Sequence, residues 1–241
     1  MLHIAVFTVA SLMAPAASPS HTVEIVEGWT VMVGAPLSAA PRRLKQRTMD
    51  KLQRQLKRVR RVLNPATLAE LRRVVIWAER KIPGYKGLVY HPSAKWLEKH
   101  GYDPRKAGGV EITRAINYVI RKTTPWAIMH ELAHAYHYQV LGTDHAEILS
   151  AYKRAKKSGK YQRVRRAKST KLHRHYGMEN VREFFAEMTE TYLGQNDFQP
   201  FNRSELKRFD PDTYRVLHTI WGPRLRARKA APAPSASGRQ N

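Results

Sequence analysis

Two histidines and a glutamate stand close together in the stretch WAIMHELAHAYHY, residues 126–138. His130, Glu131 and His134 form a His-Glu-x-x-His pattern, and residues four apart on a helix share one face. Two imidazoles so placed can bind one zinc ion, with Zn–N distances of about 2 Å. Glu131 would lie beside the pair, where its carboxylate can take a proton from a zinc-activated water. The alternative is a pair of core histidines that are satisfied by their neighbours.

The histidines must be positioned by a helix whose ends the sequence marks. Thr124 and Pro125 are typical of a helix start, and Gly142 after Leu141 is typical of a helix end. His137 lies one turn further along the same face, too far to bind the same metal. We interpret it as a residue that supports a ligand or packs in the core.

A catalytic zinc site takes three protein ligands and keeps one position open for water. The metzincin spacing requires a glycine and a histidine at two positions that are His137 and Val140 here, so that class is excluded. The third ligand must come from elsewhere in the chain. The candidates are Asp144, His145, His173, His175, Glu179, Glu183 and Glu187.

Glu183 and Glu187 are four apart on a predicted helix over 180–193, NVREFFAEMTETYL. One carboxylate could reach the metal, and the other could accept a hydrogen bond from the free ring N–H of a ligand histidine. However, Asn180 and Glu183 also fit a capping box, in which Glu183 only closes the start of the helix. Both interpretations fit the sequence.

The stretch HYGMENVREFFAEMTETY (175–192), together with HELAH, resembles the catalytic core of the anthrax lethal factor–like metallopeptidases. This gluzincin family includes the Pro-Pro endopeptidases, and the resemblance covers residues 125–193. The chain as a whole also resembles a group of basic, uncharacterised secreted metallopeptidases, which share a Gly-Trp strand near the start and an NDF-PF segment.

The resemblance implies a zinc-dependent endopeptidase that holds one Zn²⁺ per chain and acts on a peptide or protein substrate. It assigns a role to each matching residue: zinc ligands His130, His134 and Glu183, general base Glu131, oxyanion stabiliser Tyr176, and Glu187 as the carboxylate that hydrogen-bonds a ligand. It also implies a zincin-like fold.

The remaining elements predict an α+β protein, mainly helical, with a small mixed sheet beside the histidine helix and a second ligand-bearing helix. We expect one domain over 21–223. Apolar periodicity predicts an amphipathic basic helix over 42–63, a helix over 113–122 and one or two short helices over 204–221. Strands are expected at 21–34, 73–78, 85–92 and 108–112. The strand at 108–112 fits either the edge of the sheet, where it could pair with a substrate, or its interior.

The chain is strongly basic, with 43 Lys and Arg against 19 acidic residues and a formal net charge of +24. Such a balance favours anionic partners, and the basic runs 42–61 and 153–174 could bind an anionic surface or polymer. The alternative function is therefore a basic anion-, nucleic-acid- or cell-surface-binding protein with a structural or inactive metal site. No nucleic-acid recognition motif is present, so no specific nucleic acid is predicted.

A third possibility is a zinc hydrolase that acts on a non-peptide bond. The absence of cysteine excludes disulfides, Cys-rich zinc fingers and thiol catalysis.

The two ends of the chain differ from its body. Residues 4–14 are nearly all apolar and precede an Ala-Pro-Ala sequence, which predicts a signal peptide over 1–17 and a secreted, periplasmic or extracellular protein. If this stretch is not a true signal, the protein is cytoplasmic. No other stretch approaches about 20 apolar residues, so we expect no membrane protein. The Ala/Pro/Ser-rich tail over 224–241 predicts disorder.

Overall fold

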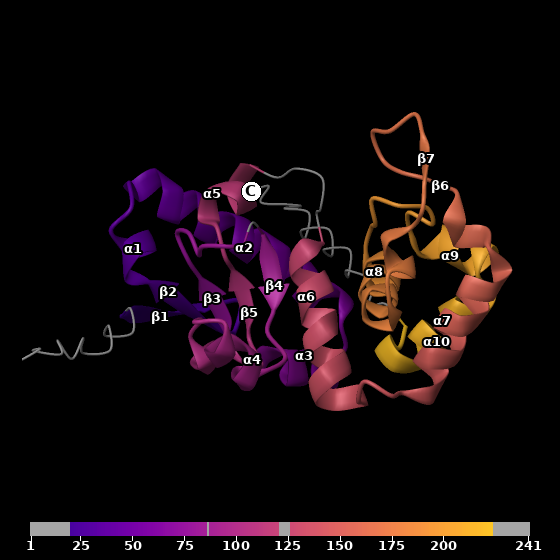
Figure 1. Ribbon diagram of the computed structural model, residues 1–241, viewed down its shortest axis with the longest axis horizontal. Coiled ribbons are helices and arrows are strands. Elements are labelled where there is room, and N and C mark those ends of the chain that lie inside the picture. Colours follow the sequence, from indigo (N-terminus) through magenta and orange to yellow (C-terminus); the bar gives the residue numbers. More distant parts are fainter. Residues whose placement is uncertain (1–19, 86, 121–125, 224–241) are drawn as a thin grey trace, which may run out of the picture.

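The computed structural model of the chain describes residues 20–85, 87–120 and 126–223 (Figure 1). The fold is α+β and mostly helical, as the sequence predicts. A small mixed sheet and the first helices form one side of the molecule, and the last helices form the other. The expected signal peptide, the expected tail and the Thr124–Pro125 helix start lie outside the described residues.

The larger sheet has five strands in the order β1-β2-β3-β5-β4. Its strands are β1 His21–Val26, β2 Trp29–Gly34, β3 Ile76–Ala78, β4 Leu88–Tyr90 and β5 Val110–Ile112. β1 and β2 form an antiparallel hairpin, β2, β3 and β5 run parallel, and β4 returns antiparallel to β5. β5 therefore lies inside the sheet, and β4 is the strand at its edge. The interior alternative for residues 108–112 is the correct one.

Within the described residues, six helices accompany this sheet on the N-terminal side of the molecule. They are α1 Ala35–Ser38, α2 Arg42–Val62, α3 Pro65–Arg72, α4 Ala94–Lys99, α5 Ala115–Ile120 and α6 Ala127–Tyr136. A short 3₁₀ turn, η1 Pro104–Lys106, precedes β5. α5 packs on α2, and α6 packs along the edge strand β4. The sheet thus fixes the position of the helix that carries the paired histidines.

The amphipathic basic helix predicted over 42–63 is α2. Its buried residues recur at helical spacing, as in Leu52, Leu56 and Val59, which are fully buried in the main core. Each such side chain contributes about 1.5–3 kcal/mol by leaving water. The Lys and Arg side chains occupy the remaining faces of the helix, most of them exposed to solvent.

The histidine helix changes its geometry before it ends. α6 continues directly into a π-helical turn, η2 His137–Leu141, and Gly142 ends the helix with a φ of +82°. A positive φ is a conformation that glycine adopts without steric cost, so the predicted stop at this position is confirmed. Asp144 lies in the turn that follows.

Four further helices build the C-terminal side: α7 Ala146–Ser158, α8 Val181–Leu193, α9 Arg203–Phe209 and α10 Pro211–Trp221. α8 lies at their centre, and every residue from Phe184 to Leu193 is buried. α7, α9 and α10 contact α8, and α6 packs on it from the other side of the molecule (Figure 1). The helix predicted over 180–193 is confirmed, and 204–221 forms two helices.

A small antiparallel hairpin, β6 Val164–Arg165 and β7 Leu172–His173, stands out from this C-terminal side (Figure 1). It lies within the basic run 153–174, for which no strand was predicted. The 3₁₀ turns η3 Lys160–Gln162 and η4 Tyr176–Met178 flank the hairpin. Among the helices in the described part of the chain, none is both long and apolar enough to cross a membrane.

Candidate metal centre

The paired histidines point from α6 toward α8. The rings of His130 and His134 lie with their centroids 4.8 Å apart and nearly perpendicular to each other. Both side chains are largely buried, with 12% and 11% of their surfaces exposed. Their spacing of one helical turn places both on the face that α8 covers.

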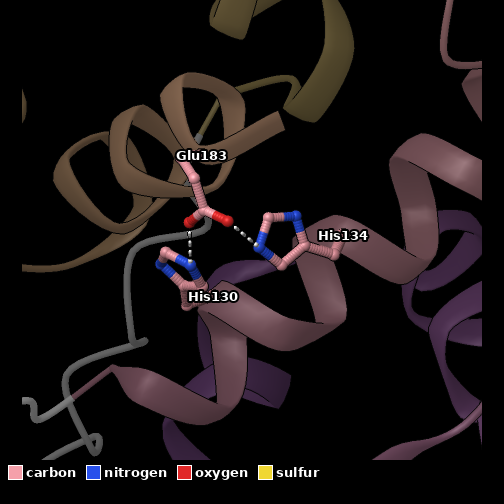
Figure 2. A group of neighbouring side chains, drawn as sticks. All are labelled: His130, His134 and Glu183. Atoms are coloured by element: carbon pink, nitrogen blue, oxygen red, sulfur yellow. Dashed lines mark hydrogen bonds and ion pairs between the residues drawn. The ribbon is translucent and has the colours of Figure 1, made fainter. Parts of the chain in front are cut away.

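Glu183 on α8 lies opposite this pair, with one carboxylate oxygen near each ring (Figure 2). Its Oε2 is 3.1 Å from His130 Nε2, and its Oε1 is 3.6 Å from His134 Nε2. One donor atom from each of the three residues lies within 4.8 Å of the other two. The packing of α6 on α8 thus brings three potential metal ligands into one group.

The capping interpretation of Glu183 is correct only in part. Asn180 caps α8, because its side-chain oxygen accepts hydrogen bonds from the backbone N–H groups of Arg182 and Glu183. The Glu183 carboxylate, however, faces the histidine rings. The backbone of Glu183 therefore serves the cap, and its side chain remains available to a metal.

The donor set fits zinc. Two imidazole nitrogens and one carboxylate oxygen are ligands that catalytic zinc sites use, and three ligands leave a position for water or substrate. Ligand atoms about 2 Å from a tetrahedral metal lie about 3.3 Å from one another. The separations of 3.1 Å from Glu183 Oε2 to His130 Nε2 and of 3.6 Å from Glu183 Oε1 to His134 Nε2 are close to this value, although each starts from a different oxygen.

The second ring nitrogen of His130 faces two further carboxylates of α8. His130 Nδ1 is 2.8 Å from Glu190 Oε1 and 3.5 Å from Glu187 Oε1. A carboxylate at this nitrogen fixes the tautomer in which Nε2 is free to bind a metal. The sequence analysis assigned this position to Glu187, but Glu190 makes the shorter contact.

Glu187 is hydrogen-bonded by Asn196, which lies in the segment after α8. Asn196 Nδ2 donates hydrogen bonds to Glu187 Oε2 and to the Glu187 backbone carbonyl, at 2.9 and 3.0 Å. Burial raises the pKa of the Glu187 carboxyl to about 8, and the neighbouring Glu190 charge adds to this shift. Burial thus favours the protonated form of Glu187 in the metal-free protein.

Glu131 lies where the edge of the sheet meets α6. Its Oε2 accepts a hydrogen bond of 2.8 Å from the backbone N–H of Tyr90 at the end of β4. This contact fixes one carboxylate oxygen and leaves the other, Oε1, available for proton transfer. The carboxylate borders a cavity of about 370 Å³.

Tyr176 borders the same cavity from the other side of the molecule and is about half exposed, at 47%. It lies in η4, where the preceding His175 accepts a hydrogen bond through Nδ1 from the backbone N–H of Gly177. Burial raises the pKa of the Tyr176 phenol above its usual value, and the nearby Glu183 carboxylate adds to the shift. The hydroxyl thus keeps its proton and can donate a hydrogen bond into the cavity.

Three of the other candidate ligands form contacts of their own outside this group. His173 contacts the Ser169 hydroxyl, Glu179 pairs with Arg174, and the buried His175 supports the turn before Tyr176. His137 is fully buried and packs on Phe185, with 4.9 Å between the ring centroids. It therefore packs in the core, one of the two alternatives that the sequence left open.

The sequence analysis missed Glu190, Asn196 and the Tyr90 backbone. Glu190 had a visible signal, because Glu183, Glu187 and Glu190 follow the i, i+4, i+7 spacing of a single helix face. Asn196 and Tyr90 carried no sequence signal, because Asn196 reaches the site from a loop and Tyr90 from the sheet. In the segment after α8, Phe198 is 7% exposed and also lines the cavity.

No protein-family model matches this chain, and neither the curated proteins nor the solved structures contain a significant match.

Proposed function

We propose that this protein is a zinc-dependent endopeptidase of the gluzincin type, with a zincin-like active site. One observation carries the proposal: His130 and His134 on α6 and Glu183 on α8 present three donor atoms in one group, and Glu131 stands beside them at a cavity. A metal site that leaves one position open and has a free carboxylate next to it is the arrangement of a hydrolase.

Bound zinc would lower the pKa of a water molecule toward neutrality and polarise the carbonyl group of the substrate. Glu131 would take the proton of the attacking water and then deliver it to the leaving amine. The hydrogen bond from the Tyr90 N–H orients the Glu131 carboxylate for both transfers. Glu190, at His130 Nδ1, would hold the imidazole in the ligating tautomer.

Tyr176 would stabilise the transition state. Tyr176 lines the cavity together with Glu131, and its protonated hydroxyl could donate a hydrogen bond to the developing oxyanion. Tyr176 is about half exposed and lies in a short 3₁₀ turn, so it could move toward a bound substrate.

The edge of the sheet supports a peptide as substrate. Thr113 N donates to Gly87 O and His91 N donates to Gly109 O, so residues 87 and 91 bond to β5 and the alternate residues face the free edge. Tyr90 N accordingly bonds to Glu131, and Leu88 lines the cavity. An extended peptide could pair with this edge beside Glu131.

The first test measures zinc and cleavage together. We expect about one zinc per chain in the purified protein, strong loss of zinc in Glu183→Ala and in His134→Ala, and normal zinc content in Glu131→Gln. Glu131→Gln should nevertheless lose cleavage of a peptide library. Absence of zinc from the wild type after zinc is supplied, or full cleavage by Glu131→Gln, would contradict the proposal.

A further inference from the structure

The segment 163–174, which we call the basic hairpin, comprises β6, β7 and the turn between them. It contains six Lys and Arg and no acidic residue. Its basic side chains are all exposed: Arg163, Arg165, Arg166, Lys168, Lys171 and Arg174. The hairpin therefore presents a concentrated positive charge to solvent.

Few of these charges are neutralised within the molecule. Arg166 pairs with Asp197 at 3.1 Å, and Arg174 pairs with Glu179. Within the described ranges, the other four basic side chains have no acidic partner. The uncompensated charge lies around the turn and along the exposed side of β6.

The basic hairpin is joined to the wall of the candidate active site. Arg166 forms an isolated antiparallel bridge with Phe198, and its guanidinium lies 4.7 Å from the centre of the Phe198 ring. Ala167 N donates to Asp197 O at 2.7 Å, and Gln199 N donates to Arg165 O at 2.9 Å. Arg166, Asp197 and Phe198 line the cavity that Glu131 and Tyr176 border. The hairpin thus rises directly from the rim of that cavity.

We propose that the basic hairpin is an extended substrate-binding surface that selects peptides with a cluster of acidic residues beside the scissile bond. This inference rests on the proposed peptidase function and adds the chemical class of its substrate. A peptide leaving the cavity past Phe198 meets Arg166 first and then the unpaired cations. Carboxylates at these positions would gain attraction at a surface of high positive potential.

An acidic peptide fits this surface better than a nucleic acid does. Proteins that bind single strands interleave basic side chains with aromatic rings on which bases stack. The basic hairpin has no Phe, Tyr or Trp, and the neighbouring Tyr161 is fully buried. The helix α2 also borders the cavity, through Lys51 and Gln55, but Lys51 Nζ donates to the backbone carbonyl of Tyr118. The basic hairpin adds a run of exposed, unpaired cations that continues outward from the cavity wall at Arg166.

The test measures binding, so it does not depend on catalysis. In a Glu131→Gln background, we would titrate the full chain with a labelled peptide containing a block of Glu and with its Gln counterpart, using fluorescence anisotropy. The hairpin variant replaces Arg163, Lys168 and Lys171 by Gln. The control variant makes the same change in net charge at three exposed positions of α2: Arg43, Arg47 and Lys57.

We expect the Glu peptide to bind more tightly than the Gln peptide, the hairpin variant to bind it about tenfold more weakly, and the control variant to change little. Added salt should reduce the difference between the two peptides. An equal loss in both variants would show non-specific attraction and overturn the proposal. Equal binding of both peptides, or preferred binding of a DNA strand at the hairpin, would also overturn it.

The parallel zinc and cleavage measurements keep this proposal separate from the proposed function. If the protein binds no zinc and cleaves no peptide, but its hairpin still prefers the Glu peptide, the peptidase function is contradicted and the proposed binding surface stands. A chain that cleaves Glu and Gln peptides equally well, before and after the hairpin change, would retain the peptidase and contradict its acidic specificity.

Discussion

Glu183 and His130 are 53 positions apart in the sequence, yet Glu183 Oε2 lies 3.1 Å from His130 Nε2. Glu183 lies in the first turn of α8, and His130 lies in the first half of α6. The contact exists because the two helices pack face to face, with the carboxylate and the imidazole both turned into the contact. Any variant that moves either helix should therefore affect the metal group as a whole.

Removing the Glu190 carboxylate should weaken metal binding without removing a ligand. In Glu190→Gln, we expect zinc affinity to fall about 10- to 100-fold, because the shortest carboxylate contact at His130 Nδ1 is replaced by a neutral amide. The matched control is Glu187→Gln, which changes the more distant carboxylate at 3.5 Å and should have the smaller effect. Competition with a fluorescent chelator measures both. A larger loss of zinc affinity in Glu187→Gln than in Glu190→Gln would show that Glu187, not Glu190, supports His130.

Tyr176→Phe should reduce turnover and leave zinc in place. The hydroxyl borders the cavity and contacts no described metal-binding atom, so metal content should stay at the wild-type level. Loss of one oxyanion donor should lower kcat about 100-fold, with little change in KM. Steady-state kinetics on a cleaved peptide check this. Unchanged kcat would remove Tyr176 from the mechanism.

A second group of charged residues lies buried on the sheet, away from the metal centre. Lys106 Nζ contacts Glu79 at 2.7 Å and also contacts Glu111, while His21 and His91 bond to these two carboxylates at 2.8 and 2.7 Å. Burial alone would raise the pKa of Glu111, but the His91 hydrogen bond and the Lys106 charge outweigh it and hold the pKa below its usual value.

Lys106→Met should destabilise the fold by about 3–5 kcal/mol, because two buried carboxylates would lose the cation between them. The exposed Lys99→Met, on the neighbouring helix α4, is the control and should change the free energy of unfolding by less than about 0.5 kcal/mol. Denaturant unfolding at neutral pH measures both values. Similar stability of the two variants would show that the buried cation adds nothing.

Stability should also fall as the pH is lowered below about 6.5. Burial lowers the pKa of His175 to about 3, whereas the unfolded chain binds its proton near the usual value of about 6.5. At pH values between these two pKa values, His175 is protonated in the unfolded state but neutral in the folded state. The free energy of unfolding should therefore fall by about 1.4 kcal/mol per pH unit from this residue.

Denaturant unfolding of the metal-free chain at several pH values between neutral and pH of about 4 tests this dependence. The variant His175→Asn keeps a side-chain acceptor for the Gly177 N–H but has no proton to bind, so its slope should be shallower. Identical slopes in the wild type and the variant would show that His175 is protonated in the folded state.

Contacts between near neighbours along the chain were enough to predict several of the helices. The amphipathic spacing of Leu52, Leu56 and Val59 was sufficient to predict α2, and the four-residue spacing of His130 and His134 placed both rings on one face of α6. The sequence also predicted the helix that carries Glu183. These features depend on the helical period, which acts over one or two turns.

Contacts between residues far apart in the sequence depended instead on how the helices and strands pack. This packing turned the Glu183 carboxylate toward the histidines while Asn180 capped the helix, brought Glu190 to His130 Nδ1, and made β4 the edge strand that holds Glu131. Residue spacing listed several possible third ligands and left Glu183 open between a metal ligand and a helix cap; only the resemblance singled it out. The choice among them depended on the packing of α6 against α8 and on the order of the strands, and neither is encoded by local spacing.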